Sequence, residues 1–468
     1  MSDPLDLEEF RANGHALVDW ITDYLASIEE RPVQAQVSPG EVRAMLPGSA
    51  PESAEPFEAL LRDLDEVVVP GLAQWQHPGW FTYFPAQSSP PSILAEMASA
   101  ALGAQGMMWV TAPAVTEIES HVLDWFVDLT GVPQDWKTTG PGGGVIQMSA
   151  SDSTHTALVV AREVCRNRTG AVAEQMVAYT SAQAHSSIEK GARVAGIGQV
   201  RLIDVDDCFA ARPEALAEAI SDDLAAGLVP VFVGASVGTT ATTAVDPIRA
   251  IGEIAAQHNL WFHVDAAYAG AAMICEEFRH HQDGLELVDS YTFNPHKWLA
   301  TNFDCSVFWV ADRKPLIDTL RITPPYLANA ASDAGEVIDY RDWHVPLGRR
   351  FRALKLWWVL RCFGAEGLRK RIRANVRQAR DLAEWIKQQP ELTLIAPTPF
   401  ALVCFAHVDG DEATQRLLDS LNSDTSVYVL GSSINQQVFI RVSIGSTWTT
   451  DRHVAALREC IKSALATP

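Results

Sequence analysis

Residues 261–310 read WFHVDAAYAGAAMICEEFRHHQDGLELVDSYTFNPHKWLATNFDCSVFWV, and this stretch carries the clearest signal of the architecture. It contains three short apolar runs, WFHV, YTF and CSVFWV, each with the length of a buried β-strand. Polar residues follow the first two runs directly: Asp265 comes after WFHV, and Asn294 and Lys297 come after YTF. The stretch therefore predicts buried strands with chemically active side chains at their carboxyl ends.

The same alternation extends toward the N-terminus. VIQMSAS precedes the helical pattern TALVVAREVCRNRTG, MVAYTSAQAHSS precedes IEKGARVAG, and VPVFVGASVGTT precedes DPIRAIGEIAAQHN. Strands that alternate with helices predict an α/β domain with a largely parallel sheet. After GRRFRALKLWWVLRCFG the pattern changes to arginine-rich helices followed by ALVCFAHV, VYVLGSS and QVFIRVSIGS. This part predicts a smaller α+β domain.

The first 70 residues carry two apolar stripes at helical spacing. The first stripe consists of Phe10, Leu17, Ile21, Tyr24 and Ile28. The second consists of Phe57, Leu60, Leu61, Leu64 and Val67. Two short amphipathic helices cannot bury both stripes by themselves, so we expect them to pack on another subunit or on the body of the protein.

Charge and composition narrow the class of protein. The net charge of −22 makes nucleic acid or an anionic membrane an unexpected partner. The acidic start MSDPLDLEEF lacks the apolar core of a signal peptide, and no apolar stretch is long enough to cross a bilayer. Seven scattered cysteines without a C-x-x-C pair predict reduced thiols, no zinc site and a cytoplasmic location.

Polar residues stand at the ends of successive predicted strands, where open α/β sheets bind ligands. They are Ser149, Ser151, His185, Thr239, Thr240, Asp265, Asn294, His296 and Lys297. Taken singly, each of these is more often an ordinary loop residue with satisfied hydrogen bonds. The occurrence of complementary chemical types at consecutive strand ends favours one shared site.

This set suits pyridoxal-5′-phosphate (PLP), which has a phosphate, a pyridine nitrogen, a flat ring and an aldehyde. Ser149 and Ser151 lie between a strand and a helix, where backbone N–H groups attract a phosphate. Asp265 could pair with the pyridinium, and His185 could stack on the ring. Lys297 could supply the amine that bonds to the aldehyde, once burial lowers its pKa.

The motifs VDAAYAG, NPHKWL, FDCSVFWV and AHSS resemble those of the group II PLP-dependent decarboxylases, and most closely the aromatic-L-amino-acid decarboxylases. The resemblance extends from QWQHPGWFTYFP through VPLGRRFRALKLWW to RVSIGS. It implies a fold-type I (aminotransferase-like) architecture and an obligate homodimer. The implied parts are an N-terminal helical dimerisation arm (1–88), a large PLP-binding α/β domain (89–354) and a small C-terminal α+β domain (355–468).

The resemblance also implies roles for individual residues. Lys297 would bind the cofactor covalently, Asp265 would pair with the pyridine nitrogen, and His185 would stack on the ring. The remaining cofactor-binding residues would be Ser149, Ala150, Ser151, Thr240, Ala267 and Asn294. His296 would approach the substrate carboxylate. Tyr326, in RITPPYLANAASDAG, would assist protonation of the substrate Cα.

Three other functions share this scaffold. An aminotransferase would need an arginine for the α-carboxylate, and Arg441 is the candidate, although we expect it to form a structural ion pair. In related aromatic aldehyde synthases a phenylalanine replaces the loop tyrosine, whereas this chain has Tyr326. A non-catalytic binding module is the third alternative. The complete set of Lys297, Asp265 and His185 argues against it.

The resemblance predicts a substrate pocket with an apolar, polarizable lining that suits an aromatic ring. Its residues would be Trp75, Tyr83, Phe84, Pro85, Ala86 and Gly348, with Met107 and Met108 contributed by the other subunit. Animal enzymes of the family carry a threonine at the position of Ala86 and an aromatic residue at that of Met107. In plant relatives a glycine at the position of Gly348 accompanies indole substrates. We therefore expect tryptophan or phenylalanine to be preferred over tyrosine and DOPA.

Overall fold

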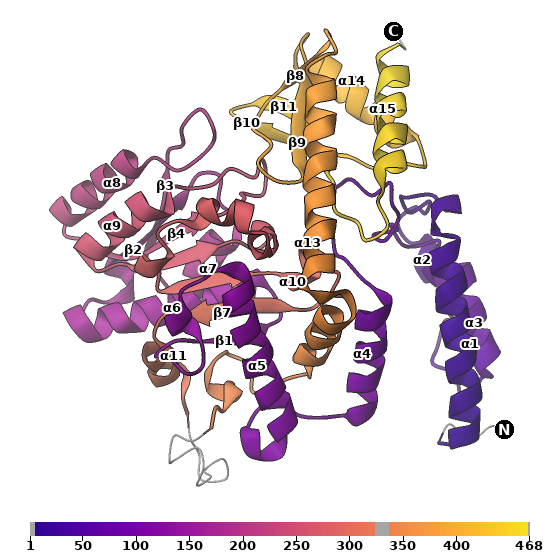
Figure 1. The fold of residues 1–468 in the computed structure, drawn as a ribbon, viewed down its shortest axis with the longest axis horizontal. Helices are drawn as coiled ribbons and strands as arrows, with labels where there is room; N and C mark the ends of the chain where they lie inside the picture. Colours follow the sequence, from indigo (N-terminus) through magenta and orange to yellow (C-terminus); the bar gives the residue numbers. More distant parts are fainter. Residues whose placement is uncertain (1–4, 323–336, 467–468) are drawn as a thin grey trace.

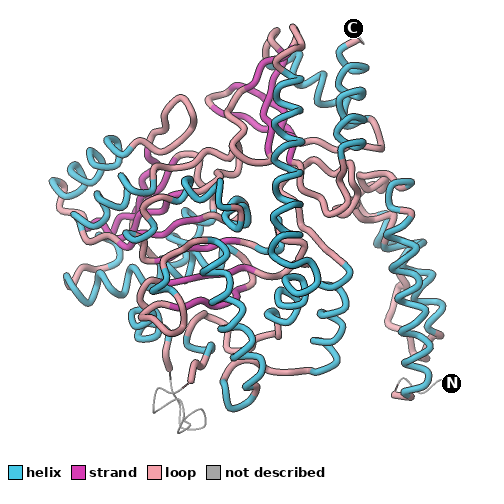
Figure 2. The backbone as a smooth tube through the Cα atoms, in the orientation of Figure 1, coloured by secondary structure: helices cyan, strands magenta, loops and turns pink. Residues whose placement is uncertain are grey.

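The computed structural model describes residues 5–322 and 337–466 of the 468-residue chain. A central sheet carries helices on both faces, and a smaller sheet lies beside the far half of the long helix α13 (Figures 1 and 2). The N-terminal helices lie apart from the central sheet. This arrangement confirms the α/β fold with a mostly parallel sheet that the strand–helix alternation predicts.

Seven strands form the central sheet, in the order β1-β7-β6-β5-β4-β2-β3. They are β1 (Gly143–Gln147), β2 (Met176–Ser181), β3 (Gln199–Ile203), β4 (Val229–Ser236), β5 (Trp261–Asp265), β6 (Ser290–Phe293) and β7 (Ser306–Val310). Strand β7 is antiparallel to both of its neighbours, and the pairs among β6, β5, β4, β2 and β3 are parallel. Most of these strands are buried along their whole length, which explains their continuous apolar sequences.

Helices cover both faces of this sheet, and two clusters of buried side chains separate them from it. One face packs against α6 (Ala150–Thr169), α7 (Ser187–Ala195) and α11 (Arg313–Leu320). The other packs against α5 (Pro113–Thr130), α8 (Pro213–Ala225) and α9 (Ile248–His258). Two further helices are α4 (Pro90–Leu102), which packs on α13, and the short α10 (Pro295–Trp298).

The C-terminal part forms an antiparallel sheet with the order β10-β11-β9-β8. Its elements are β8 (Leu392–Leu394), β9 (Leu402–His407), α14 (Asp411–Ser423), β10 (Leu430–Ile434), β11 (Gln437–Ser443) and α15 (Asp451–Leu465). Helix α13 (Arg352–Ile386) leads into this part and is interrupted at Gly364, whose φ of 66° is unfavourable for residues with a Cβ. The boundary expected between residues 354 and 355 falls in the first turn of α13, and the division into domains stays a prediction.

Three helices precede the main body: α1 (Leu7–Ala26), α2 (Glu41–Met45) and α3 (Phe57–Asp63). Asp6 caps α1 by accepting hydrogen bonds from the N–H groups of Glu8 and Glu9. Helices α1 and α3 pack on each other, and Trp20 Nε1 donates to Asp65 at 3.0 Å. Large apolar side chains of α1 nevertheless remain exposed, including Phe10 at 68%. Within residues 5–322 and 337–466, no helix is both long and apolar enough to cross a membrane.

Candidate functional site

A cavity of about 220 Å³ lies at the carboxyl ends of strands β1, β4, β5 and β6. Its lining contains all nine residues predicted to bind the cofactor: Ser149, Ala150, Ser151, His185, Thr240, Asp265, Ala267, Asn294 and Lys297. His296 and Phe84 line the same cavity. The parallel strands all end at this edge of the sheet, so residues as far apart in the sequence as Ser149 and Lys297 meet here.

The N-terminus of α6 forms one wall of the cavity. Ser149 is its N-cap, and the Ser149 Oγ accepts from the backbone N–H of Asp152 at 3.2 Å. Ala150 and Ser151 begin the helix, where the first N–H groups have no acceptor inside the helix. Such a terminus, with its partial positive charge, is suited to binding a phosphate.

Lys297 and Asp265 provide the charged groups of the cavity. Lys297 belongs to the short helix α10, and burial lowers the pKa of its amine, while the nearby Asp265 acts in the opposite direction. Asp265 ends β5, and its Oδ1 accepts from the N–H of Ala267 at 2.9 Å. No hydrogen bond or ion pair joins the Lys297 amine to another residue of the described chain, so the amine is available to a ligand.

Two histidines face the same space in fixed orientations. His185 Nδ1 accepts from the N–H of Ser187 at 3.2 Å and lies 2.9 Å from the Ser187 Oγ. Burial lowers the pKa of His185. His296 Nδ1 accepts from the N–H of Cys305 at 2.9 Å, and burial, with a smaller effect of Lys297, lowers the pKa of His296 to about 3. The His296 ring is therefore uncharged at neutral pH.

Comparison with known proteins places this site in a family. The profile of the pyridoxal-dependent decarboxylase conserved domain matches residues 39–408. The chain belongs to the pyridoxal-dependent decarboxylase family. Phenylacetaldehyde synthase of Arabidopsis thaliana is 44% identical over 96% of this chain and 94% of its own. Tryptophan decarboxylase 2 of Oryza sativa subsp. japonica is 42% identical over 97% of this chain and 94% of its own.

A solved relative has the same fold over the whole chain. The crystal structure of Oryza sativa TDC with PLP and tryptamine superimposes with a TM-score of 0.97, at 37% identity, and covers 99% of both chains. These findings confirm the group II decarboxylase resemblance and the fold-type I architecture that it implies. The protein is a PLP-dependent carboxy-lyase.

The cavity of this decarboxylase fits PLP on structural grounds. The Oδ1 of Asn294 is buried and has no hydrogen-bond partner in the described chain. A buried amide without a partner is costly, and a ligand in the cavity would satisfy it. The terminus of helix α6 is suited to the phosphate, and the carboxylate of Asp265 to the pyridine nitrogen. The free amine of Lys297 is suited to the aldehyde. The donor set is therefore complementary to each polar group of the cofactor.

The prediction for Arg441 needs a correction. No acidic residue of the described chain forms an ion pair with it; instead its Nε and Nη2 donate to the carbonyls of Ala241 and Thr240, at 2.9 and 2.5 Å. The guanidinium also lies 5.5 Å from the centre of the Phe84 ring. The sequence reveals the charge of Arg441 but not the two carbonyls that replace a carboxylate. Arg441 does not belong to the cavity lining, which argues against a direct contact with a substrate carboxylate.

Aromatic residues complete the cavity, and two of them were not predicted. Tyr268 stacks between Phe84 and Trp298, with ring centres 3.9 and 4.7 Å apart. Phe303 is 64% exposed at the rim and meets the His296 ring at 4.7 Å. The position of Tyr268, three residues after Asp265 in the small-residue run AAYAG, could have indicated a packing role. Phe303 begins the motif FDCSVFWV, but neither its position nor its residue type indicates a contact with the cavity.

Most of the predicted substrate-pocket residues lie outside this cavity. They are Trp75, Tyr83, Pro85, Ala86, Met107, Met108 and Gly348. Trp75 and Tyr83 stack at 5.6 Å on the surface. Met108 is buried against Arg341, and Met107 accepts from Arg341 through its carbonyl at 2.9 Å. Their assignment to substrate binding stays a prediction, and Tyr326 lies outside the described residues.

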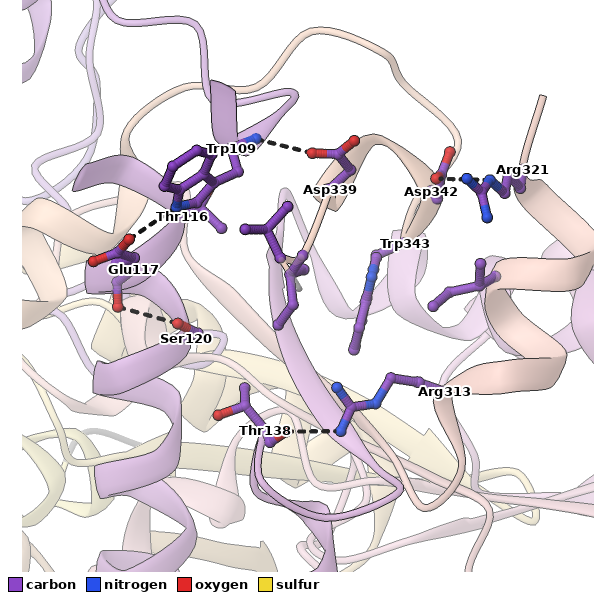
Figure 3. Close-up of a pocket in the computed structure, with 13 residues that line it drawn as sticks. Trp109, Thr116, Glu117, Ser120, Thr138, Arg313, Arg321, Asp339, Asp342 and Trp343 are labelled. Atoms are coloured by element: carbon purple, nitrogen blue, oxygen red, sulfur yellow. Dashed lines mark hydrogen bonds and ion pairs between the residues drawn. The ribbon is translucent and has the colours of Figure 1, made fainter. Parts of the chain in front are cut away.

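A second and larger cavity, of about 520 Å³, is shown in Figure 3. Trp109, Glu117 and Thr138 line one side, and Arg313 and Asp342 lie opposite. Its polar groups already bind one another: Glu117 accepts from Trp109 Nε1 at 2.8 Å, and Arg313 donates to the Thr138 carbonyl at 2.9 Å. Among residues 5–322 and 337–466, none of the predicted site residues lines it, and this part of the chain offers it no lysine amine for the cofactor. The smaller cavity is therefore the candidate active site.

Proposed function

We propose that this enzyme decarboxylates an aromatic L-amino acid to the arylalkylamine and CO₂. The observation that carries the proposal is the 220 Å³ cavity, in which the unpartnered amine of Lys297 lies among Asp265, His185 and the N-terminus of α6. When bound, PLP supplies an electron-accepting ring that weakens the bond from Cα to the carboxylate. Everything else in the reaction falls to the residues of the chain.

Four groups would hold the cofactor. The Lys297 amine would bond to the aldehyde carbon, and the N–H groups at the start of α6 would bind the phosphate. Asp265, which is 6% exposed, would keep a proton on the pyridine nitrogen. His185 would cover one face of the ring, and its orientation is supported by the two contacts with Ser187.

Two residues would act on the substrate. His296 would donate a hydrogen bond from its Nε2–H to the substrate carboxylate and orient it. Tyr326 would deliver a proton to Cα after CO₂ has left, a role that rests on the family resemblance alone. The apolar stack of Phe84 and Tyr268 excludes water from the base of the cavity, which favours the loss of a charged carboxylate as neutral CO₂.

The side chain of the substrate is proposed to be aromatic, with tryptophan or phenylalanine favoured over tyrosine and DOPA. Ala86 has no hydroxyl that could pair with a phenol oxygen, and a buried phenol without a partner is unfavourable. Gly348 leaves room for a larger ring. Two relatives support an aromatic substrate, because their names refer to phenylacetaldehyde and to tryptophan.

We also propose a homodimer that completes the site. Met107 and Met108 do not reach the cavity of their own subunit, which is consistent with a role in the site of a partner. The exposed apolar side chains of α1, such as Leu7 and Phe10, would be covered by a second copy of the chain. The seven free thiols support a reducing compartment, the cytoplasm. Sedimentation analysis would test the dimer.

A second function, aromatic aldehyde synthase, is favoured by the 44% identity to phenylacetaldehyde synthase. That reaction consumes O₂ and water and yields the aldehyde, CO₂, ammonia and hydrogen peroxide. It shares every cofactor contact with the decarboxylase. The two functions therefore differ in their products, which makes product analysis the deciding measurement.

The test begins with absorbance between roughly 330 and 430 nm, where bound PLP absorbs, and continues with each aromatic amino acid in turn. CO₂, amine, aldehyde and peroxide are measured together. Equal CO₂ and amine without peroxide are expected, and Lys297→Ala should remove both the absorbance and the activity. Lys314→Ala, at an exposed lysine, is the control that should change neither. Aldehyde with peroxide would establish the second function, and a protein that never binds PLP would refute both.

A further inference from the structure

Two basic side chains lie close to the ring of Phe84. The Lys297 Nζ is 5.3 Å from its centre, and the Arg441 Cζ is 5.5 Å from the same point. Arg441 is 3% exposed and lies on β11 of the C-terminal sheet, whereas Lys297 lies on the short helix α10, which follows β6 of the central sheet. A positive charge therefore stands near the amine that would bind the cofactor, on a residue outside the cavity lining.

The position of this charge is fixed by the backbone. The Arg441 Nε and Nη2 donate to the carbonyls of Ala241 and Thr240, and Thr240 itself lines the cavity. Cys404, the neighbour of Arg441 across the sheet, donates to the same Ala241 carbonyl at 3.4 Å. Because carbonyls carry no net charge, the full positive charge of Arg441 is left to act on its surroundings, and low local polarity extends its reach.

The other groups around Lys297 do not supply a positive charge at neutral pH. Asp265 is the acidic neighbour, and it favours the protonated amine. His185 and His296 face the same cavity, and burial lowers the pKa of each, which keeps them uncharged. Burial is the largest cause of the lowered pKa of Lys297, Asp265 acts against it, and Arg441 adds a smaller effect in the same direction as burial. Tyr268 and Cys404, the titratable neighbours of Arg441, remain uncharged because burial raises the pKa of both.

We propose that Arg441 is a positioning residue that favours the unprotonated form of the Lys297 amine before the cofactor binds. Only the unprotonated amine has the lone pair that bonds to the aldehyde carbon, with release of water, whereas an ammonium group has none. The inference rests on the proposed function in one respect, since it takes Lys297 as the cofactor-binding lysine. It assigns Arg441 an electrostatic action through Lys297 rather than a contact with the substrate.

The test measures the proton on Lys297 in the cofactor-free protein. An amine-reactive reagent is applied across a range of pH, and the modification of the Lys297 peptide is followed by mass spectrometry. The rate at high pH reports access to the amine, and the midpoint of the pH curve reports its protonation. Circular dichroism at each pH shows that the protein stays folded.

Arg441→Gln removes the charge but retains a donor for one of the carbonyls. In this variant the midpoint of the Lys297 modification curve should lie at a higher pH than in the wild type. Below the midpoint Lys297 should therefore react about fivefold more slowly than in the wild type, and at high pH the two rates should be equal. Arg441→Met is the substitute if the Gln variant does not fold. Arg441→Lys, which keeps a charge, should shift the midpoint less than either.

Arg371→Gln is the matched control. Arg371 also donates to a backbone carbonyl, that of Thr447 at 2.6 Å, and lies 5.7 Å from the Phe363 ring, but it does not face Lys297. In Arg371→Gln the pH curve of Lys297 modification should coincide with that of the wild type. An unchanged midpoint in Arg441→Gln or Arg441→Met would overturn the proposal. Because no turnover is measured, this result is independent of whether the loaded enzyme decarboxylates its substrate.

Discussion

The Nδ1 atom of His296 accepts a hydrogen bond of 2.9 Å from the backbone N–H of Cys305. This bond determines the tautomer of the ring, because a nitrogen that accepts cannot also carry the proton. The proton of the neutral ring is therefore on Nε2, and His296 lines the cavity. The bond makes His296 an uncharged donor toward the substrate.

We expect His296→Ala to lower kcat/KM about 100-fold, because a hydrogen bond to a charged carboxylate is lost in a site shielded from water. His296→Gln should recover part of the loss, since its amide N–H can donate. The pKa of about 3 means that the ring stays neutral from pH 5 to 9. Steady-state kinetics over that range checks this. An inflection near pH 6.5 in the wild type that vanishes in His296→Ala would contradict the assignment.

The fit of the ring is predicted to depend on Gly348. A Cβ at this position would lie 3.3 Å from the Nε2 of Gln105, closer than most such contacts. The backbone at Gly348 is not in the left-handed region, so serine can be accommodated without strain of the main chain. We expect Gly348→Ser to lower the ratio of kcat/KM for tryptophan over tyrosine by about tenfold, because the pocket narrows and gains a hydroxyl.

A second substitution separates the narrowing of the pocket from the effect of the added hydroxyl. Gln105 also accepts from the N–H of Arg349 at 2.6 Å, which holds its amide against Gly348. Gln105→Ala together with Gly348→Ser should restore part of the tryptophan turnover if crowding is the cause. An unchanged substrate ratio in Gly348→Ser would place this residue outside the substrate pocket.

The sequence predicts which residues line the smaller cavity, because β-strands impose a simple geometry. Ser149, His185, Asp265 and Lys297 each follow an apolar run, and the ends of parallel strands meet at one edge. Contacts between the C-terminal sheet and the loops of the central sheet do not follow from the positions of strand ends. The carbonyl partners of Arg441, 200 positions earlier in the chain, were therefore not predictable from its neighbours.

The substrate pocket was harder to predict for a different reason. Its wall is expected to be shared between subunits, so the position of Met107 in one chain does not decide whether it touches the ring. Phe303 shows the same limit within a chain, because its contact with His296 depends on the course of a loop. Backbone periodicity predicts strand ends, but side-chain contacts between loops require the folded structure.

The buried ion pair of Arg349 and Glu119 is predicted to be essential for stability. The Nη2 of Arg349 lies 2.5 Å from the Glu119 Oε1, and the two side chains are 1% and 0% exposed. Arg349→Met would leave a buried carboxylate without its counter-charge, at a cost of about 3–5 kcal/mol. A lower midpoint of urea unfolding would report this loss. The double variant with Glu119→Gln should be less destabilised than the sum of the single variants.

An exposed ion pair provides the comparison. Lys314 and Asp318 bind each other one turn apart on α11, with side chains 75% and 60% exposed. Water and salt screen such a pair, so Lys314→Met should leave the midpoint of urea unfolding close to that of the wild type. Equal effects of Lys314→Met and Arg349→Met would show that burial does not set the strength of these pairs.

Tyr326 is predicted to decide between amine and aldehyde as the product. If Tyr326 delivers the proton to Cα, Tyr326→Phe removes the donor and leaves Cα open to O₂. CO₂ should then still be released, while aldehyde and peroxide replace most of the amine. Tyr428→Phe is a control of the same chemistry outside the cavity, at a tyrosine that packs edge-on against Trp80. Its products should match those of the wild type.

This experiment separates two causes of low activity. A variant that loses CO₂ and amine together has lost substrate or cofactor binding, because both functions need the bond from Cα to the carboxylate to break. A variant that keeps CO₂ but exchanges amine for aldehyde has lost only the proton donor. Amine as the sole product of Tyr326→Phe would therefore assign the proton to another group, and His296, whose Nε2 proton faces the cavity, would become the residue to test next.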